Sequence, residues 1–219
     1  MTTRFNQPEV KLVCFSAPGG CGKTTIINEL MAGGSAAKFT VFSSITRSFY
    51  ASRGIQNESE FHSLLSPNDK LNFQLDLIAF YMASLAEAVS NCKTKYLICD
   101  RAVFDHAAYA SYTAINSGLL NPEFVKDLEH ICDVFKDTYK PVVITLPYPP
   151  HWDIKNNEDG FRKVDFVKDW QLGVLIDHYI GKYYGAHKNV YQYSHIQTVT
   201  VQDAVEEVLK MIDPEADWE

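Results

Sequence analysis

The stretch from Lys11 to Ile27, KLVCFSAPGGCGKTTII, constrains the fold more than any other part of the chain. It begins with a short apolar run, Leu12 to Phe15, that is typical of a buried strand. A glycine-rich loop follows, and a Lys-Thr pair then opens an apolar-periodic segment that predicts a helix. This order of features predicts a phosphate-binding P-loop, whose consensus G-x-x-x-x-G-K-[ST] is met except at Ala17, its first position.

The residues of this loop suit a polyphosphate. Glycines allow positive φ angles, so successive backbone N–H groups can point toward one anion. The first turn of the helix adds unpaired N–H groups and the positive end of its dipole. We expect Lys23 to face the β- and γ-phosphates of ATP and the Thr24 hydroxyl to ligate Mg²⁺. The full set expected to bind ATP is Gly19, Gly20, Cys21, Gly22, Lys23, Thr24 and Thr25.

Composition restricts the class of protein. The chain has 219 residues, which suits one domain with a buried core, and we treat 1–219 as that domain. No apolar run reaches the roughly 18 residues of a membrane span, and the first residues lack the apolar core of a secretion signal, so we expect a cytoplasmic protein without a membrane partner. The net charge of −7 argues against a broad surface for nucleic acid, although a local basic channel stays compatible with it.

Strand and helix patterns alternate along the chain. Strands are expected at 12–15, 39–42, 95–100, 141–146 and 189–193, and helices at about 22–31, 43–52, 67–90, 103–116, 122–136, 164–184 and 201–212. Strands separated by helices predict an α/β fold, a P-loop three-layer sandwich with a parallel five-stranded sheet. Ligands on such a sheet bind outside the carboxyl ends of its strands.

Asp100 and Arg101 come directly after the third predicted strand. A carboxylate there could hold Mg²⁺ through water, orient the acceptor or act as a general base, and the guanidinium could clamp phosphate oxygens. A surface ion pair is the alternative. Asp105 and Tyr109 share one face of the next predicted helix, where Asp105 either contacts the acceptor or lies on a solvated face.

Three further positions are candidates for contact with the acceptor. Arg47 follows the second predicted strand and either reaches the acceptor or is a plain surface arginine. Phe73 could stack on a base and Gln74 could bond its edge, the alternatives being a core ring and a surface amide. After the fourth strand, a polar segment at about 147–163 resembles a mobile lid, from which Arg162 could close over the transferring phosphate.

The P-loop, the Asp-Arg pair after the third strand, the Phe-Gln pair on the preceding helix and the basic lid together resemble the P-loop nucleoside and nucleotide kinase group, above all deoxynucleoside and thymidylate kinases. Asp159 to Arg162, Asp-Gly-x-Arg, is similar to the lid of nicotinamide riboside kinase-like proteins, many of them phage-encoded. The resemblance implies that Lys23 and Thr24 hold ATP and Mg²⁺ and that Arg162 is a lid arginine.

The same resemblance implies that Asp100 and Arg101 act at the acceptor and that Gln74 contacts its base. The chain departs from the group after its second strand. Ser43-Ser44 stands where deoxynucleoside kinases carry a glutamate and thymidylate kinases an Arg-Glu-Pro or similar sequence. We therefore expect ATP-dependent phosphorylation of a small molecule, either a nucleoside or a nucleoside monophosphate.

Two other functions stay open from the sequence. The first is a kinase of a hydroxymethylated base in DNA, which would need a basic groove that the composition does not indicate. The second is a P-loop ATPase or switch acting on a protein partner, which would turn over ATP without a small-molecule acceptor. A homodimer is compatible with the sequence and is not predicted by any motif in it.

Overall fold

The computed structural model describes residues 10–43, 45–146, 165–184, 190–192 and 201–216. The expected lid, 147–163, lies outside these residues. In chain order the elements are β1 Lys11–Ser16, α1 Lys23–Ala32, the 3₁₀ helix η1 Gly34–Lys38, β2 Phe39–Phe42, α2 Thr46–Ser52, α3 Glu58–Leu64, α4 Pro67–Asn91, β3 Tyr96–Asp100, α5 Val103–Asn116, α6 Pro122–Tyr139, β4 Val142–Thr145, α7 Phe166–Tyr184, β5 Val190–Gln192 and α8 Val201–Ile212.

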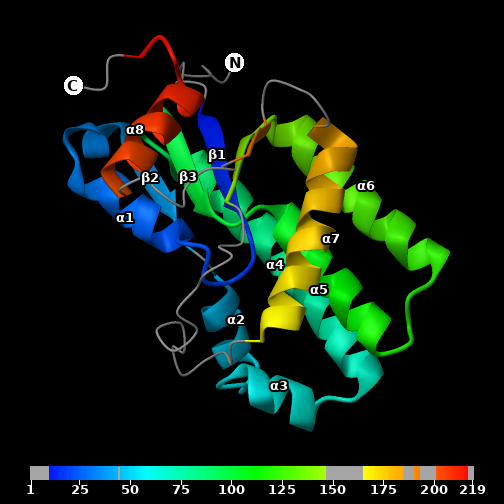
Figure 1. Ribbon diagram of the computed structural model, residues 1–219. Helices are drawn as coiled ribbons and strands as arrows, with labels where there is room; N and C mark the ends of the chain where they lie inside the picture. The colour runs from blue at the N-terminus through cyan, green and yellow to red at the C-terminus, as the bar shows by residue number, and fades with distance from the viewer. Residues whose placement is uncertain (1–9, 44, 147–164, 185–189, 193–200, 217–219) are drawn as a thin grey trace, which may run out of the picture.

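Five parallel strands form one sheet in the order β2-β3-β1-β4-β5 (Figure 1). β1 lies at the centre, with Phe15 opposite Asp100 of β3 and Phe15 also opposite Ile144 of β4. The short β5 pairs with β4 from Val190 onward. The predicted α/β fold with a parallel five-stranded sheet is therefore confirmed, and the carboxyl ends of β1 and β3 lie side by side.

The sheet is buried on both faces, which explains why its strands are nearly continuous apolar runs. In β1, Leu12 and Cys14 pack into the core on one face, whereas Val13 and Phe15 pack into the core on the other. The first core is completed by α4, α5, α6 and α7, and the second by α1 and α8 (Figure 1). Helix, sheet and helix make the three layers that the sequence predicts.

Helix α4 begins where its capping residues predict. Ser66 is the N-cap and its hydroxyl accepts a hydrogen bond from the Asp69 N–H at 3.3 Å, while Pro67 occupies the first helical position. The apolar stripe of this helix faces the first core through Ile78 and Leu85. α4 packs along α5, and it therefore fixes the position of the residues that follow β3.

Two short elements are missing from the sequence prediction. No helix is predicted between Gly54 and Ser66, whereas α3 lies there and packs with α2 on the beginning of α4. The seven residues of α3, ESEFHSL, are mostly polar and include one buried ring, Phe61, so they give no periodic apolar signal. The 3₁₀ helix η1 is also absent from the prediction. Among the described helices, none is long and apolar enough to cross a membrane.

Candidate functional site

The P-loop connects β1 to α1 at the carboxyl edge of the sheet. Gly20 has a φ of 79° and Gly22 a φ of 82°, in the left-handed region that glycine adopts without strain. A Cβ added to Gly22, the N-cap of α1, would meet no atom within 4 Å, so the loop borders open space. Backbone N–H groups at the start of a helix with no acidic side chain in its first turn suit an anion.

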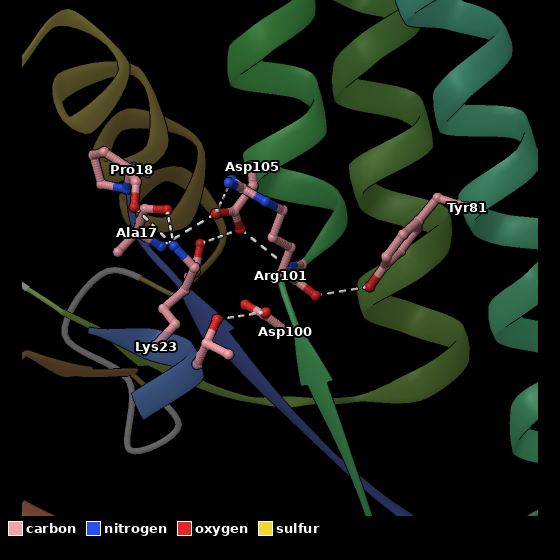
Figure 2. Close-up of polar contacts among 10 residues, drawn as sticks. Ala17, Pro18, Lys23, Tyr81, Asp100, Arg101 and Asp105 are labelled. Carbon is pink, nitrogen blue, oxygen red and sulfur yellow. Dashed lines mark hydrogen bonds and ion pairs between the residues drawn. The ribbon is translucent and has the colours of Figure 1, made fainter. Parts of the chain in front are cut away.

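Lys23 is the first residue of α1 and lies under the loop. Its ammonium group donates hydrogen bonds of 2.7 Å to the carbonyl oxygens of Ala17 and Pro18 (Figure 2). The residue is only 5% exposed. Burial, followed by the nearby Arg101 charge, lowers the pKa of Lys23 to about 8. The ammonium has three donors, and these two carbonyl groups leave one for a further acceptor.

The P-loop and the end of β3 are joined by one hydrogen bond. Thr24 Oγ1 donates to Asp100 Oδ2 at 3.0 Å (Figure 2). A hydroxyl and a carboxylate at an exposed edge are oxygen ligands of the kind Mg²⁺ prefers, and Mg²⁺ takes the rest of its shell from water and phosphate. Within the described ranges there is no cluster of three or more His, Cys, Asp or Glu side chains. The residues present therefore fit a Mg²⁺ ion that is shared with a nucleotide, and not a metal caged by protein alone.

Asp105 lies behind the P-loop and is completely buried. Its carboxylate accepts hydrogen bonds from Ser16 Oγ at 2.5 Å, from the Ala17 N–H at 3.1 Å and from the Ala102 N–H at 2.9 Å (Figure 2). Burial raises its pKa, and the charges of Arg101 and Lys23 oppose that effect. Asp105 therefore ties the beginning of the P-loop to the beginning of α5. It lies on no solvated face, and its described partners are protein groups.

Arg101 is held in an unusual backbone conformation. Its φ is 127°, which costs free energy in a non-glycine residue, and the Tyr81 hydroxyl donates a 2.9 Å hydrogen bond to its carbonyl oxygen. The guanidinium lies over the Tyr109 ring, 5.3 Å from its centroid, with Nη1 3.6 Å from Asp105 Oδ1. Nη1 is buried and makes no hydrogen bond within the described structure. A buried, charged donor without an acceptor is suited to an incoming oxygen atom.

A cavity of about 760 Å³, counted with its opening to solvent, lies beside Arg101 between α2, α3, α4, α5 and α7. Aromatic walls come from Tyr50, Phe61, Tyr109 and Tyr112, and charged groups come from Glu58, Arg101, Lys168 and Asp169. The cavity therefore combines flat apolar surfaces with a few polar groups, as expected of a site for an aromatic small molecule.

The predicted acceptor residues differ in their relation to this cavity. Gln74 is 3% exposed and lines it. Phe73 is a core ring, 4.6 Å from the Tyr50 centroid and 5.2 Å from that of Phe61, so it packs against rings that line the cavity. Arg47 is exposed on α2, where its neighbour Thr46 lines the cavity. Arg162 lies outside the described residues.

Several residues of this cavity, notably Glu58, Lys168 and Asp169, have no role predicted from the sequence. The sequence does carry a local signal for the helix that begins at Glu58. Asn57 caps α3 by accepting the Glu60 N–H at 3.0 Å, while Glu60 Oε2 accepts the Gln56 N–H at 2.7 Å, so the Asn-x-x-Glu sequence marks a helix beginning at Glu58. Nothing in the local sequence indicates that α7 reaches this helix.

Comparisons with known proteins agree with this architecture. A family model described as an AAA domain matches residues 12–207. A crystal structure of NadR protein in complex with NR superposes with a TM-score of 0.63 at 14% identity, covering 93% of this chain and 50% of that one. A structure of deoxyadenosine kinase from M. mycoides with bound dATP has a TM-score of 0.58 at 13% identity, covering 91% of this chain and 97% of that one. No curated protein matches the sequence significantly.

At these identities the solved structures establish the fold alone, which is that of P-loop kinases, as the sequence resemblance predicts. This chain spans half the length of the NadR chain, so the likeness concerns one part of that protein.

Proposed function

Because this chain belongs to the AAA-domain family, we propose that it is a P-loop phosphotransferase that moves the γ-phosphoryl group of ATP to a nucleoside or a nucleoside monophosphate. One observation carries the proposal: adjacent residues at the end of β3 serve two sites. Asp100 bonds Thr24 of the P-loop, and Arg101 lines the cavity beyond it. A donor nucleotide and a small acceptor would therefore meet at this point.

The P-loop would hold ATP through its backbone N–H groups and through Lys23, whose ammonium keeps one donor beyond its two bonds to loop carbonyl groups. Thr24 and Asp100 would hold Mg²⁺, and the bound ion neutralises charge on the β- and γ-phosphates. Arg101 would bind the reacting oxygen of the acceptor through Nη1. Asp100 would orient that oxygen and, when it is a hydroxyl, take its proton. The protein contributes position and charge rather than covalent chemistry.

The cavity would hold the base and sugar of the acceptor. Gln74 would bond the edge of the base, and Tyr50 and Phe61 would provide the stacking surface expected of Phe73, which packs behind them. Asp105 would position Arg101 and the P-loop rather than contact the acceptor. Arg47 and Arg162 remain proposed contacts from the sequence. One of the solved structures of similar fold is of a deoxyadenosine kinase with bound dATP, which supports this choice of acceptor class.

A direct test incubates the protein with ATP labelled on its γ-phosphate and with a panel of nucleosides, nucleoside monophosphates and duplex DNA, and resolves the products by mass. We expect label in one class of small molecule. Label in DNA would identify a base kinase instead. Release of labelled phosphate alone, at a rate that no panel member changes, would contradict the proposal and favour an ATPase or switch.

A further inference from the structure

An ion pair in the wall of the cavity joins α3 to α7. Lys168 Nζ contacts Glu58 Oε1, and both side chains are largely buried, at 12% and 19% exposed. Both residues line the cavity that contains Arg101 and Gln74.

Within this pair, Glu58 cancels the positive charge that Lys168 would otherwise add to the cavity wall. Among its described lining residues, two are basic, Arg101 and Lys168, and two are acidic, Glu58 and Asp169. The two histidines add no positive charge at neutral pH: burial lowers the pKa of His106 to about 3, and burial, followed by the Lys70 charge, lowers that of His62. The described residues of the cavity wall therefore carry no net charge, and Glu58 already neutralises Lys168.

A nucleoside monophosphate would bring a charge of about −1.5 to −2 into this cavity. Proteins that bind such groups supply several unpaired cations, usually arginines in bidentate contact. Here Arg101 is itself close to the buried Asp105, and Lys168 is paired. Burying a second anion beside Glu58 and Asp169 is unfavourable, because like charges repel strongly in a partly desolvated site.

Given the phosphotransferase proposed above, we propose that Glu58, by neutralising Lys168, makes this cavity select an uncharged acceptor, a nucleoside, over a nucleoside monophosphate. Glu58 is then the specificity-determining residue. In the reaction, a bond forms between a nucleoside hydroxyl oxygen and the γ-phosphorus as the bond from that phosphorus to the β–γ bridging oxygen breaks. ADP leaves with the bonding electron pair, and the hydroxyl proton passes to Asp100 and on to solvent.

The experiment measures kcat/KM for a set of nucleosides and for their 5′-monophosphates, with labelled ATP at saturation. We expect the wild-type protein to favour nucleosides. In Glu58→Gln the carboxylate charge is lost and Lys168 is released, so the ratio of monophosphate to nucleoside kcat/KM should rise by about ten- to a hundredfold, the worth of one hydrogen bond to a charged group.

Three further variants make the test specific. Lys168→Met should lower that ratio, because it leaves Glu58 as an unpaired anion. The double variant Glu58→Gln, Lys168→Met restores a balanced wall and should return the ratio to near the wild-type value. Asp76→Asn removes the carboxylate of an exposed pair with Arg53, on α4 and away from the cavity lining, and should leave the ratio unchanged.

The outcomes separate the two proposals. Wild-type preference for monophosphates, or a Glu58→Gln ratio equal to that of the wild type in a folded protein, would overturn the role of the pair and leave the phosphotransferase intact. Transfer to neither class, with ATP hydrolysed, would overturn the phosphotransferase and the inference that rests on it. If Glu58→Gln does not fold, the inference stands or falls on Lys168→Met and the double variant.

Discussion

Thr24 Oγ1 and Asp100 Oδ2 are joined by a 3.0 Å hydrogen bond that connects two residues 76 positions apart in the chain. The bond is a consequence of strand order. β1 and β3 are neighbours, and Phe15 lies opposite Asp100, so the loop after β1 and the last residue of β3 meet at the same edge of the sheet. A hydroxyl from one segment and a carboxylate from the other thus share the place where nucleotide-bound Mg²⁺ would bind.

The first prediction concerns this pair of ligands. Thr24→Val and Asp100→Asn should each raise the Mg²⁺ concentration for half-maximal activity by about tenfold or more, because each removes one oxygen from the metal site. Thr24→Ser keeps the hydroxyl and should stay near the wild-type value. Steady-state rates across a Mg²⁺ titration measure the effect. Identical titration curves for all four proteins would place the metal elsewhere.

The second prediction concerns the strained backbone of Arg101. Tyr81→Phe removes the hydroxyl that bonds the Arg101 carbonyl oxygen at 2.9 Å, and it should raise the acceptor KM several-fold with little change in the ATP KM. Tyr179→Phe is the matched control, since it loses a buried hydroxyl contact of 2.7 Å to Ser111. Each variant should lose about 1 kcal/mol of unfolding free energy. Equal acceptor KM values for the two variants would show that Tyr81 acts on stability alone.

The third prediction uses two glycines of α7. A Cβ on Gly173 would lie 3.3 Å from Pro18 Cγ in the P-loop, whereas one on Gly181 would meet nothing within 4 Å. Gly181→Ala should stabilise the protein by about 0.5–1 kcal/mol through helix propensity. Gly173→Ala should gain less stability than Gly181→Ala, because the rigid proline ring has to move. The same displacement of the P-loop should raise the ATP KM. Denaturant unfolding and ATP kinetics test both, and equal gains with an unchanged KM would contradict the close approach.

Much of the framework is predictable from local sequence. The strand at Phe39–Phe42 and the helices at Val103–Asn116 and Val201–Ile212 have the predicted bounds, because continuous apolar runs and long periodic stripes are strong signals. Seven-residue α3 gives no comparable stripe. The P-loop residues are predictable for a related reason, since the motif encodes its own backbone geometry.

The rest of the site depends on contacts between distant segments. Asp105 looks from its spacing like a residue on a helix surface, yet its carboxylate is buried against Ser16 and Ala17, which precede it by almost 90 positions. The contact between Glu58 and Lys168 likewise exists only because α3 and α7 pack around one cavity. Side-chain pairs of this kind follow from tertiary packing, and a single sequence carries no local signal for them.

The fourth prediction follows from the pKa of Lys23, which burial lowers to about 8. The charged ammonium is the form that attracts phosphate, so kcat/KM for ATP should fall as pH rises through about 8 in the free enzyme. Lys23→Arg keeps its charge to much higher pH and should lose this alkaline limb, whatever its absolute rate. The effect on stability has the opposite sign. Burial of the charged ammonium lowers the free energy of unfolding below about pH 8, and this penalty disappears as the pH rises toward the pKa of lysine in the unfolded chain. A flat profile in the wild type up to pH 10 would contradict the prediction.

Phosphoryl transfer at the P-loop should depend on Lys23, and a comparison of three proteins tests this dependence. Initial rates of γ-phosphoryl transfer to the acceptor are measured for the wild type, for Lys23→Ala and for Lys126→Ala, which removes an exposed lysine of α6. Lys23→Ala should lose at least about a hundredfold in rate while keeping its thermal transition, because a charge aimed at the transferring group stabilises the transition state. Lys126→Ala should match the wild type. A folded Lys23→Ala protein that transfers phosphate at a near-normal rate would contradict the account.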